Sequence, residues 1–174
     1  EVLKNAGAIP VTLTGGEIFS ALQSGAIDAT EWVGPYNDLA FGFYQAADYY
    51  YASVWHEPGT GLEFLVNQEA FYALPADLQS IVEIAANAAN ESTLAEYNAR
   101  NNAALKTLIE EHNVQLRKFP AEVMQALKYH TDELIKEQVK ADKDFARVWL
   151  SYSEFLASMK EYNKLTLQAY YENR

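Results

Sequence analysis

The sequence contains no cysteine and little positive charge, and both features limit what the protein can do. Without cysteine there is no disulfide framework, no thiolate zinc site and no thiol nucleophile, and the absence is compatible with a periplasmic protein. The 13 Lys and Arg residues stand against 24 Asp and Glu, for a formal net charge of −11. That balance argues against a nucleic-acid partner, which needs a basic face, and against anionic membranes. An anionic ligand would need a local arginine or a metal ion.

Long apolar runs and the common catalytic motifs are also absent. No run approaches the roughly 20 apolar residues that span a bilayer. We find no nucleophile elbow, P-loop, dinucleotide fingerprint or His-Glu-x-x-His motif. The composition, 49% hydrophobic and 21% charged, argues against disorder. The length of 174 residues is enough for one domain with a core.

The first part of the chain predicts short strands and helices in alternation. It opens EVLKNAG, which reads as the end of a helix with Gly7 after it, so we expect a fragment that lacks its N-terminal part. A helix is predicted over 15–24, closed by Gly25, and one or two short helices over 35–47. Apolar, β-branched and aromatic runs predict buried strands at 8–13, 27–32, 49–55 and 62–67.

The remainder is predicted to be mostly helical. We expect a short helix capped by Asn67, a long helix from Pro75 to about Glu111, and a strand at 114–119. No glycine or proline follows residue 120, so helices are predicted over 121–140 and 144–172. The last would be about 43 Å long, more than the roughly 30 Å of a small domain. Its apolar stripe at 3–4 spacing comprises Phe145, Val148, Trp149, Tyr152, Leu156, Met159 and Tyr162.

The stretch DATEWVGPYND, residues 28–38, holds a candidate site. Glu31 and Glu57 each follow an apparent strand and lie at the start of a turn or loop. Glu31 also precedes a large apolar ring and a chain reversal. Two carboxylates with backbone carbonyls form a hard oxygen site suited to calcium. The same residues could be solvated loop glutamates, or an acid–base pair as in glycoside hydrolysis.

Three further residues near these glutamates in the sequence also have more than one interpretation. Trp32 and Trp55 could each line a pocket or belong to the core, and His56 could be a ligand, a base or a surface residue. A third hypothesis is a helical interaction protein built on residues 121–174. A binding module, an enzyme and an interaction protein therefore all stay open from the residues alone.

A longer segment resembles a known family. GGEIFSALQSGAIDATEWVGPYNDLAFGFYQAADYYYASVWHEPG is similar to the central signature of TRAP-transporter substrate-binding proteins, the DctP-like solute-binding family 7. The nearest branch binds 2-oxo and 2-hydroxy monocarboxylates, and the resemblance continues through LEFLVNQEAFYALPADLQSIVEIAA to the C-terminal helix. It implies an α/β, periplasmic binding protein-like two-lobe fold (type II-like), here a fragment lacking most of the first lobe, with long C-terminal helices. Residues 1–55 would belong to the second lobe, 56–97 to the first, and 98–174 to the second-lobe return and the helices.

The resemblance also implies a function without chemistry. The protein would be a periplasmic receptor, not an enzyme, that binds a small monocarboxylate such as pyruvate or lactate and delivers it to the TRAP membrane permease. A metal would bridge protein and substrate. An arginine and a glutamine that complete the site would lie in the missing N-terminal part. The C-terminal helices would be exchanged in a homodimer, although a fold-back onto the chain's own lobes could also bury their apolar stripe.

Site residues follow by position. Glu31 would give its carboxylate to the metal, Trp32 its backbone carbonyl, and Glu57 a further side-chain ligand. Trp32 would also face the substrate, beside Glu31 and Trp55. Members with glutamine at the position of Glu57 resemble sodium binders; two glutamates and an anionic substrate instead favour calcium over sodium, and a roomy site favours calcium over magnesium.

Overall fold

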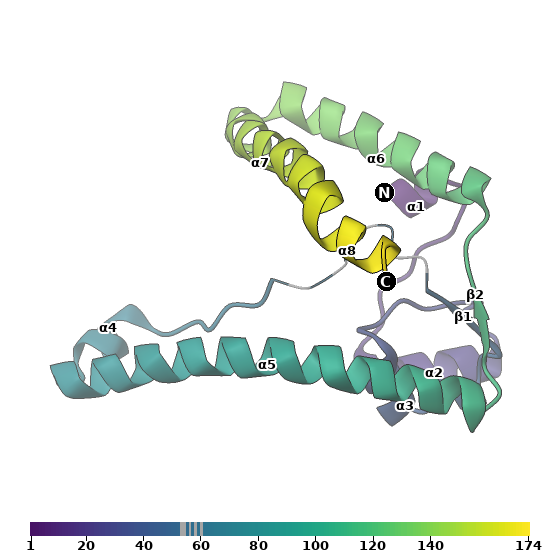
Figure 1. Cartoon of the computed structure of the whole chain (residues 1–174), viewed down its shortest axis with the longest axis horizontal. Helices are drawn as coiled ribbons and strands as arrows, with labels where there is room; N and C mark the ends of the chain where they lie inside the picture. Colours follow the sequence, from purple (N-terminus) through teal and green to yellow (C-terminus); the bar gives the residue numbers. More distant parts are fainter. Residues whose placement is uncertain (53–54, 56, 58, 60) are drawn as a thin grey trace. The chain divides into compact units, whose positions relative to one another are not determined.

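The chain forms two compact units in the computed structural model, which describes residues 1–52, 55, 57, 59 and 61–174 (Figure 1). One unit combines Glu1–Pro10 with Pro120–Arg174, and the other is Val11–Phe119. In each unit, short-range sequence features define the helices, and a few long-range contacts hold the elements together.

The unit formed by the two chain ends is helical. Helix α1 (Val2–Asn5) packs on α6 (Ala121–Ala141), and α6 packs on α7 (Lys143–Asn163). Helix α1 closes at Gly7, whose φ of 94° lets the amides of Gly7 and Ala8 return to the carbonyls of Lys4 and Leu3, each at 3.0 Å. The prediction of a helix end with Gly7 after it is confirmed.

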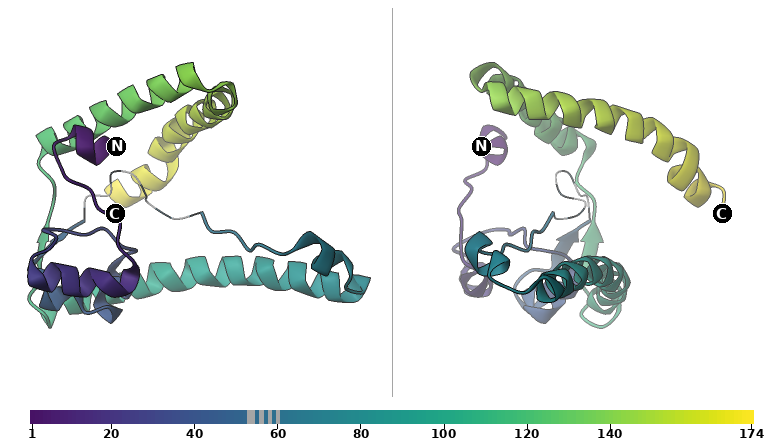
Figure 2. Two further views of the ribbon diagram at one scale, coloured as in Figure 1. Left: turned by 180° about the vertical axis from the view of Figure 1, so that it is seen from behind. Right: turned by 90° about the vertical axis from the view of Figure 1, so that its left-hand side faces the viewer.

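The C-terminal helix is capped and continuous. The Asp142 carboxylate accepts from the backbone N–H groups of Asp144 and Phe145 at 2.8 and 3.0 Å. Helix α7 continues through a π-helical turn, η2 (Lys164–Gln168), into α8 (Ala169–Glu172), as Figure 2 shows. The helices predicted over 121–140 and 144–172 are confirmed.

Unit Val11–Phe119 has a small core around its first helix. In α2 (Gly15–Ser24), both the N–H and the hydroxyl of Thr14 donate to Glu17 Oε2, at 3.1 and 2.8 Å, which lowers the pKa of Glu17. The helix ends at Gly25, with φ 72°. Helix α3 (Pro35–Ala40) and a 3₁₀ turn, η1 (Phe43–Gln45), follow. They confirm the one or two short helices predicted over 35–47. The buried core residues are Ile18, Leu22 and Phe43.

A two-stranded parallel sheet joins distant parts of this unit. Strand β1 (Tyr49–Tyr51) pairs with β2 (Gln115–Arg117), with Tyr50 opposite Leu116. Each strand is shorter than predicted: β1 covers the start of 49–55, of which 53 and 54 lie outside the described residues, and β2 the middle of 114–119. The parallel direction requires a long connection, which helices supply.

That connection consists of α4 (Gln68–Tyr72) and the 35-residue α5 (Ala76–Glu110). Asn67 caps α4 as predicted, accepting from the Ala70 N–H at 2.9 Å. The C-terminal part of α5 packs on α3 and buries Ala104 and Leu108. Among the described residues, no helix combines the length and apolar composition that crossing a bilayer requires.

The strands predicted at 8–13, 27–32 and 62–67 are wrong, because these segments have no regular secondary structure. A strand needs a neighbour for its backbone N–H and C=O groups, and within the described residues only β1 and β2 pair. The apolar side chains of 62–67 stay in solvent: Phe64 is 71% exposed and Leu65 is 82% exposed. An apolar, β-prone sequence is therefore insufficient here without a partner strand.

Candidate functional site

Glu31 lies in the irregular segment between α2 and α3. Its side chain is exposed, and the Thr30 hydroxyl donates to its backbone carbonyl at 3.1 Å. Three residues later Gly34 caps α3 and Pro35 occupies its first turn, where the missing N–H costs nothing. The chain reversal predicted after Glu31 and Trp32 is thus a turn into a helix. Among the described residues, none donates a hydrogen bond to the Glu31 carboxylate or forms an ion pair with it.

Trp32 packs its ring into the small core. The ring lies 5.3 Å from that of Phe41, centroid to centroid, and contacts the core cluster. A Cβ placed on Gly15 would lie 2.6 Å from the indole, so only glycine fits beneath the ring. The indole Nε1 is buried and has no hydrogen-bonding partner within the described chain. This packing agrees with the core interpretation of the ring; contact with a ligand stays a prediction.

Asp38 and Tyr50 form a half-buried pair beside this segment. The Tyr50 hydroxyl donates to Asp38 Oδ2 at 2.7 Å, which joins β1 to α3. Burial raises the pKa of Asp38; the Tyr50 hydroxyl and the amides of Val33 and Gly34 oppose that rise, and the charge of Glu31 adds to it. Burial, followed by Asp38, raises the pKa of Tyr50 far above its ordinary value. Asp38 Oδ1 is buried without a partner in the described part of the chain.

Helix α5 holds the other side of the turn. The Tyr36 N–H donates to Asn101 Oδ1 at 2.9 Å, across 65 positions of sequence. The Tyr36 ring meets Tyr97 edge-on at 6.0 Å, and the Arg100 guanidinium lies 5.1 Å from the centroid of the Tyr36 ring. Asn101 and Tyr50 could not be predicted from the sequence as site-supporting residues, because neither belongs to a local motif.

The second half of the predicted metal site is less completely described. Trp55 is half-buried and Glu57 exposed, and His56 lies outside the described residues. Among the residues that are described, no three His, Asp or Glu side chains gather to hold a metal ion. The predicted site uses only two carboxylates, so the pairing of Glu31 with Glu57 stays a prediction.

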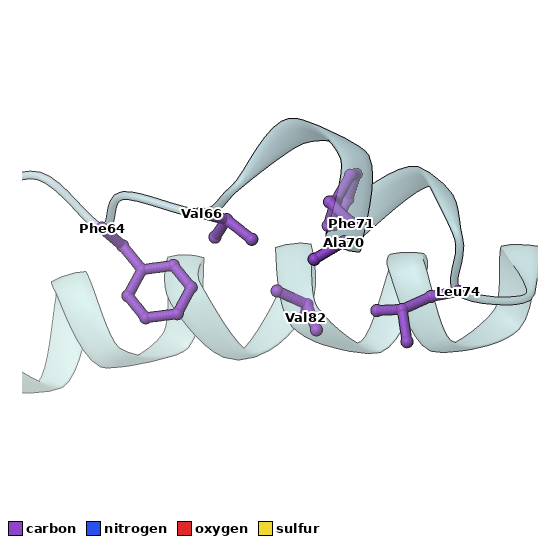
Figure 3. Close-up of a pocket in the computed structure, with 6 residues that line it drawn as sticks. All are labelled: Phe64, Val66, Ala70, Phe71, Leu74 and Val82. Atoms are coloured by element: carbon purple, nitrogen blue, oxygen red, sulfur yellow. The ribbon is translucent and has the colours of Figure 1, made fainter.

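An apolar pocket lies on a different part of the same unit, between the segment before α4, α4 itself and the start of α5 (Figure 3). Its volume is about 270 Å³. The lining is wholly hydrophobic: Phe64, Val66, Ala70, Phe71, Leu74 and Val82. Among the described residues no charged side chain lines it, so this lining offers no anchor for a carboxylate, and the described site residues Glu31, Trp32, Trp55 and Glu57 lie outside it.

Residues 1–142 match the family described as bacterial extracellular solute-binding protein, family 7, DctP. The chain is also 36% identical, over 173 residues, to the monocarboxylate 2-oxoacid-binding periplasmic protein of Nostoc sp.. That alignment covers 99% of this chain and 47% of the relative.

Solved structures give the same result. A TRAP periplasmic solute-binding protein of Colwellia psychrerythraea, with bound calcium and pyruvate, matches with a TM-score of 0.94 and 39% identity over 99% of this chain and 53% of its own. One of Pseudoalteromonas atlantica, with sodium and pyruvate, matches at 0.92 and 40%, with the same coverage. A third, of Bordetella bronchiseptica, matches at 0.86 and 32% over 99% and 51%; it is a mixed-occupancy dimer with copurified calcium and picolinate.

These comparisons confirm the predicted family and fold class. The chain has the fold of the corresponding part of TRAP periplasmic binding proteins, and it spans about half the length of the relatives it matches. The relatives named above are solute-binding proteins and not enzymes. Those with pyruvate hold calcium in one case and sodium in the other, the two ions predicted.

Proposed function

The chain belongs to bacterial extracellular solute-binding protein family 7, and we propose that it is the C-terminal part of a periplasmic TRAP receptor for a small 2-oxo or 2-hydroxy monocarboxylate. The observation that carries this proposal is the TM-score of 0.94, over 99% of the chain, with a relative that holds calcium and pyruvate. Pyruvate is accordingly the first ligand to test, with lactate second. The receptor releases its ligand unchanged.

Calcium is the proposed metal, with sodium the alternative. Glu31 and Glu57 supply carboxylates and Trp32 its backbone carbonyl, a set of hard oxygen donors that fits calcium. The Glu31 side chain is exposed and free of other described partners, and the partly buried Asp38 adds negative potential beside it. When bound, the metal would offset the charge of the substrate carboxylate in a chain whose net charge is −11. Trp32 and Trp55 are the proposed pocket walls.

The lobe assignment of the chain is also a proposal. Residues 1–55 and 98–174 are assigned to the second lobe and 56–97 to the first. Exposure supports the middle assignment: the N-terminal half of α5 leaves Ile81 59% and Ile84 67% exposed, next to the exposed segment 62–67. Apolar surface of this extent needs a cover, which the first lobe of a receptor about twice this length would supply. Helix α5 runs without a break across residue 97 and would therefore link the lobes.

Delivery to a TRAP membrane permease and a homodimeric state complete the proposal. Helix α7 has no buried residue and leaves Val148, Tyr152 and Phe155 exposed. A second copy of the receptor could pack on this apolar surface and bury it. The Bordetella relative is a dimer, which supports the same assignment.

Calorimetry of the full-length receptor tests the function. We expect pyruvate to bind with measurable heat in the presence of calcium, and less tightly after the metal is removed with a chelator. Recovery of unchanged pyruvate after long incubation distinguishes a receptor from an enzyme that uses Glu31 and Glu57 as acid and base. Absence of binding to pyruvate and lactate, with both metals, would overturn the proposal.

A further inference from the structure

The first turn of α3 is capped from outside its own segment. The first N–H groups of a helix lack partners within it, and the residue before the helix usually supplies a side-chain acceptor. Here that residue is Gly34, which has no side chain, and Pro35 has no N–H. The N–H of Tyr36 is therefore satisfied by Asn101 of α5, at 2.9 Å.

The surroundings of Asn101 fit this one contact closely. A Cβ on Gly34 would lie 3.2 Å from Asn101 Oδ1, so glycine lets the helix approach. The Tyr36 ring is held by Tyr97 and Arg100, one turn and one residue before Asn101 on the same helix. Asn101 is half-buried, whereas its neighbour Asn102 is exposed.

The geometry points to a role in positioning the proposed ligand site. The Trp32 ring is fixed against Gly15 and Phe41, and the Tyr36 amide is fixed by Asn101. Only three residues separate these two anchors, so the backbone carbonyl of Trp32 is held between them, and Glu31 directly precedes the first anchor.

We propose that Asn101 is a positioning residue for the metal ligands Glu31 and Trp32, acting through the Tyr36 amide. Ligands held before the metal arrives need less ordering on binding, which raises affinity. The inference rests on the proposed function, since it takes Glu31 and the Trp32 carbonyl as the ligands.

The test uses Asn101→Ala in the full-length receptor, with Asn102→Ala as the matched control on the same helix. Calcium affinity is measured by calorimetry and stability by thermal unfolding of the metal-free protein. We expect Asn101→Ala to weaken calcium binding about three- to tenfold, the range set by one partly buried hydrogen bond, and Asn102→Ala to leave it unchanged. Normal calcium affinity with reduced stability would make Asn101 a structural residue only and overturn the proposal.

Asn101→Asp provides a rescue, because it keeps an oxygen acceptor in nearly the same place. Measured at about 0.5 M KCl to screen the added charge, it should bind calcium within about twofold of the unaltered receptor. Affinity as weak as that of Asn101→Ala would refute a role through the Tyr36 amide.

A double-mutant cycle guards against a variant that fails to fold. Gly34→Ala places a methyl group against Asn101 Oδ1, so it should weaken calcium binding when Asn101 is present and have less effect in Asn101→Ala. If Asn101→Ala does not fold, Asn101→Ser, whose shorter side chain withdraws the oxygen from Gly34, serves as the second background. Equal effects in both backgrounds would contradict the coupling. An unaltered receptor that binds no calcium would instead remove the proposed metal site itself.

Discussion

Replacing Tyr50 by phenylalanine removes one oxygen atom from the support of the candidate site. The lost hydroxyl donates to Asp38 Oδ2 at 2.7 Å, and Asp38 Oδ1 already lacks a partner in the described chain. The variant therefore leaves a partly buried carboxylate without its side-chain donor, while the tyrosine ring volume is nearly preserved. Strand β1 also loses its link to α3.

The expected cost depends on pH. Burial raises the pKa of Asp38, and the Tyr50 hydroxyl opposes this, so the variant raises that pKa further. A raised carboxyl pKa disfavours the fold above that pKa and has no effect once the group is protonated. We expect Tyr50→Phe to lower the free energy of unfolding by about 1.5–3 kcal/mol at pH 7, the range for hydrogen bonds to charged groups. Below the pKa of Asp38 the loss should fall to about 0.5–1.5 kcal/mol, as for neutral pairs.

Urea unfolding of the full-length receptor at neutral and acid pH measures both values. Tyr49→Phe is the control, since Tyr49 is exposed and the change keeps the ring beneath Arg117. An equal loss at both pH values would refute the assignment of a charged Asp38 held by Tyr50. A loss no larger than that of the control would refute the contact itself.

Three further predictions concern the site and the proposed dimer. Glu57→Gln should weaken calcium and pyruvate binding together, because a charged metal ligand becomes neutral; unchanged calcium affinity by calorimetry would remove Glu57 from the site. Trp32→Ala should lower stability by about 3–5 kcal/mol because the ring packs on Gly15, and should also weaken pyruvate binding because the ring is a proposed pocket wall; unchanged pyruvate affinity would make the ring a core residue only. Phe155→Asp puts a charge on a side chain that is 64% exposed in this chain, and should convert a dimer to a monomer in light scattering; an unaltered receptor that is monomeric at micromolar concentration would contradict the dimer.

The helices could be predicted from sequence because their signals are local. Gly25 ends α2, Asn67 caps α4, Pro75 precedes α5 and Asp142 caps α7, and each acts within one turn of its own position. The family was also recognisable from one continuous stretch, which contains Glu31 and Trp32.

The strands and the support of the site could not be predicted in the same way. Segments 8–13, 27–32 and 62–67 have strand-like composition, yet a strand exists only where another backbone pairs with it. Local sequence identified Glu31 and Trp32 as candidates, but only the tertiary structure showed the indole packed on Gly15 and the turn held by Tyr50 and Asn101. Capping and helical periodicity are properties of adjacent residues. A hydrogen bond across 65 positions depends instead on how α5 packs against α3, and no local pattern encodes that.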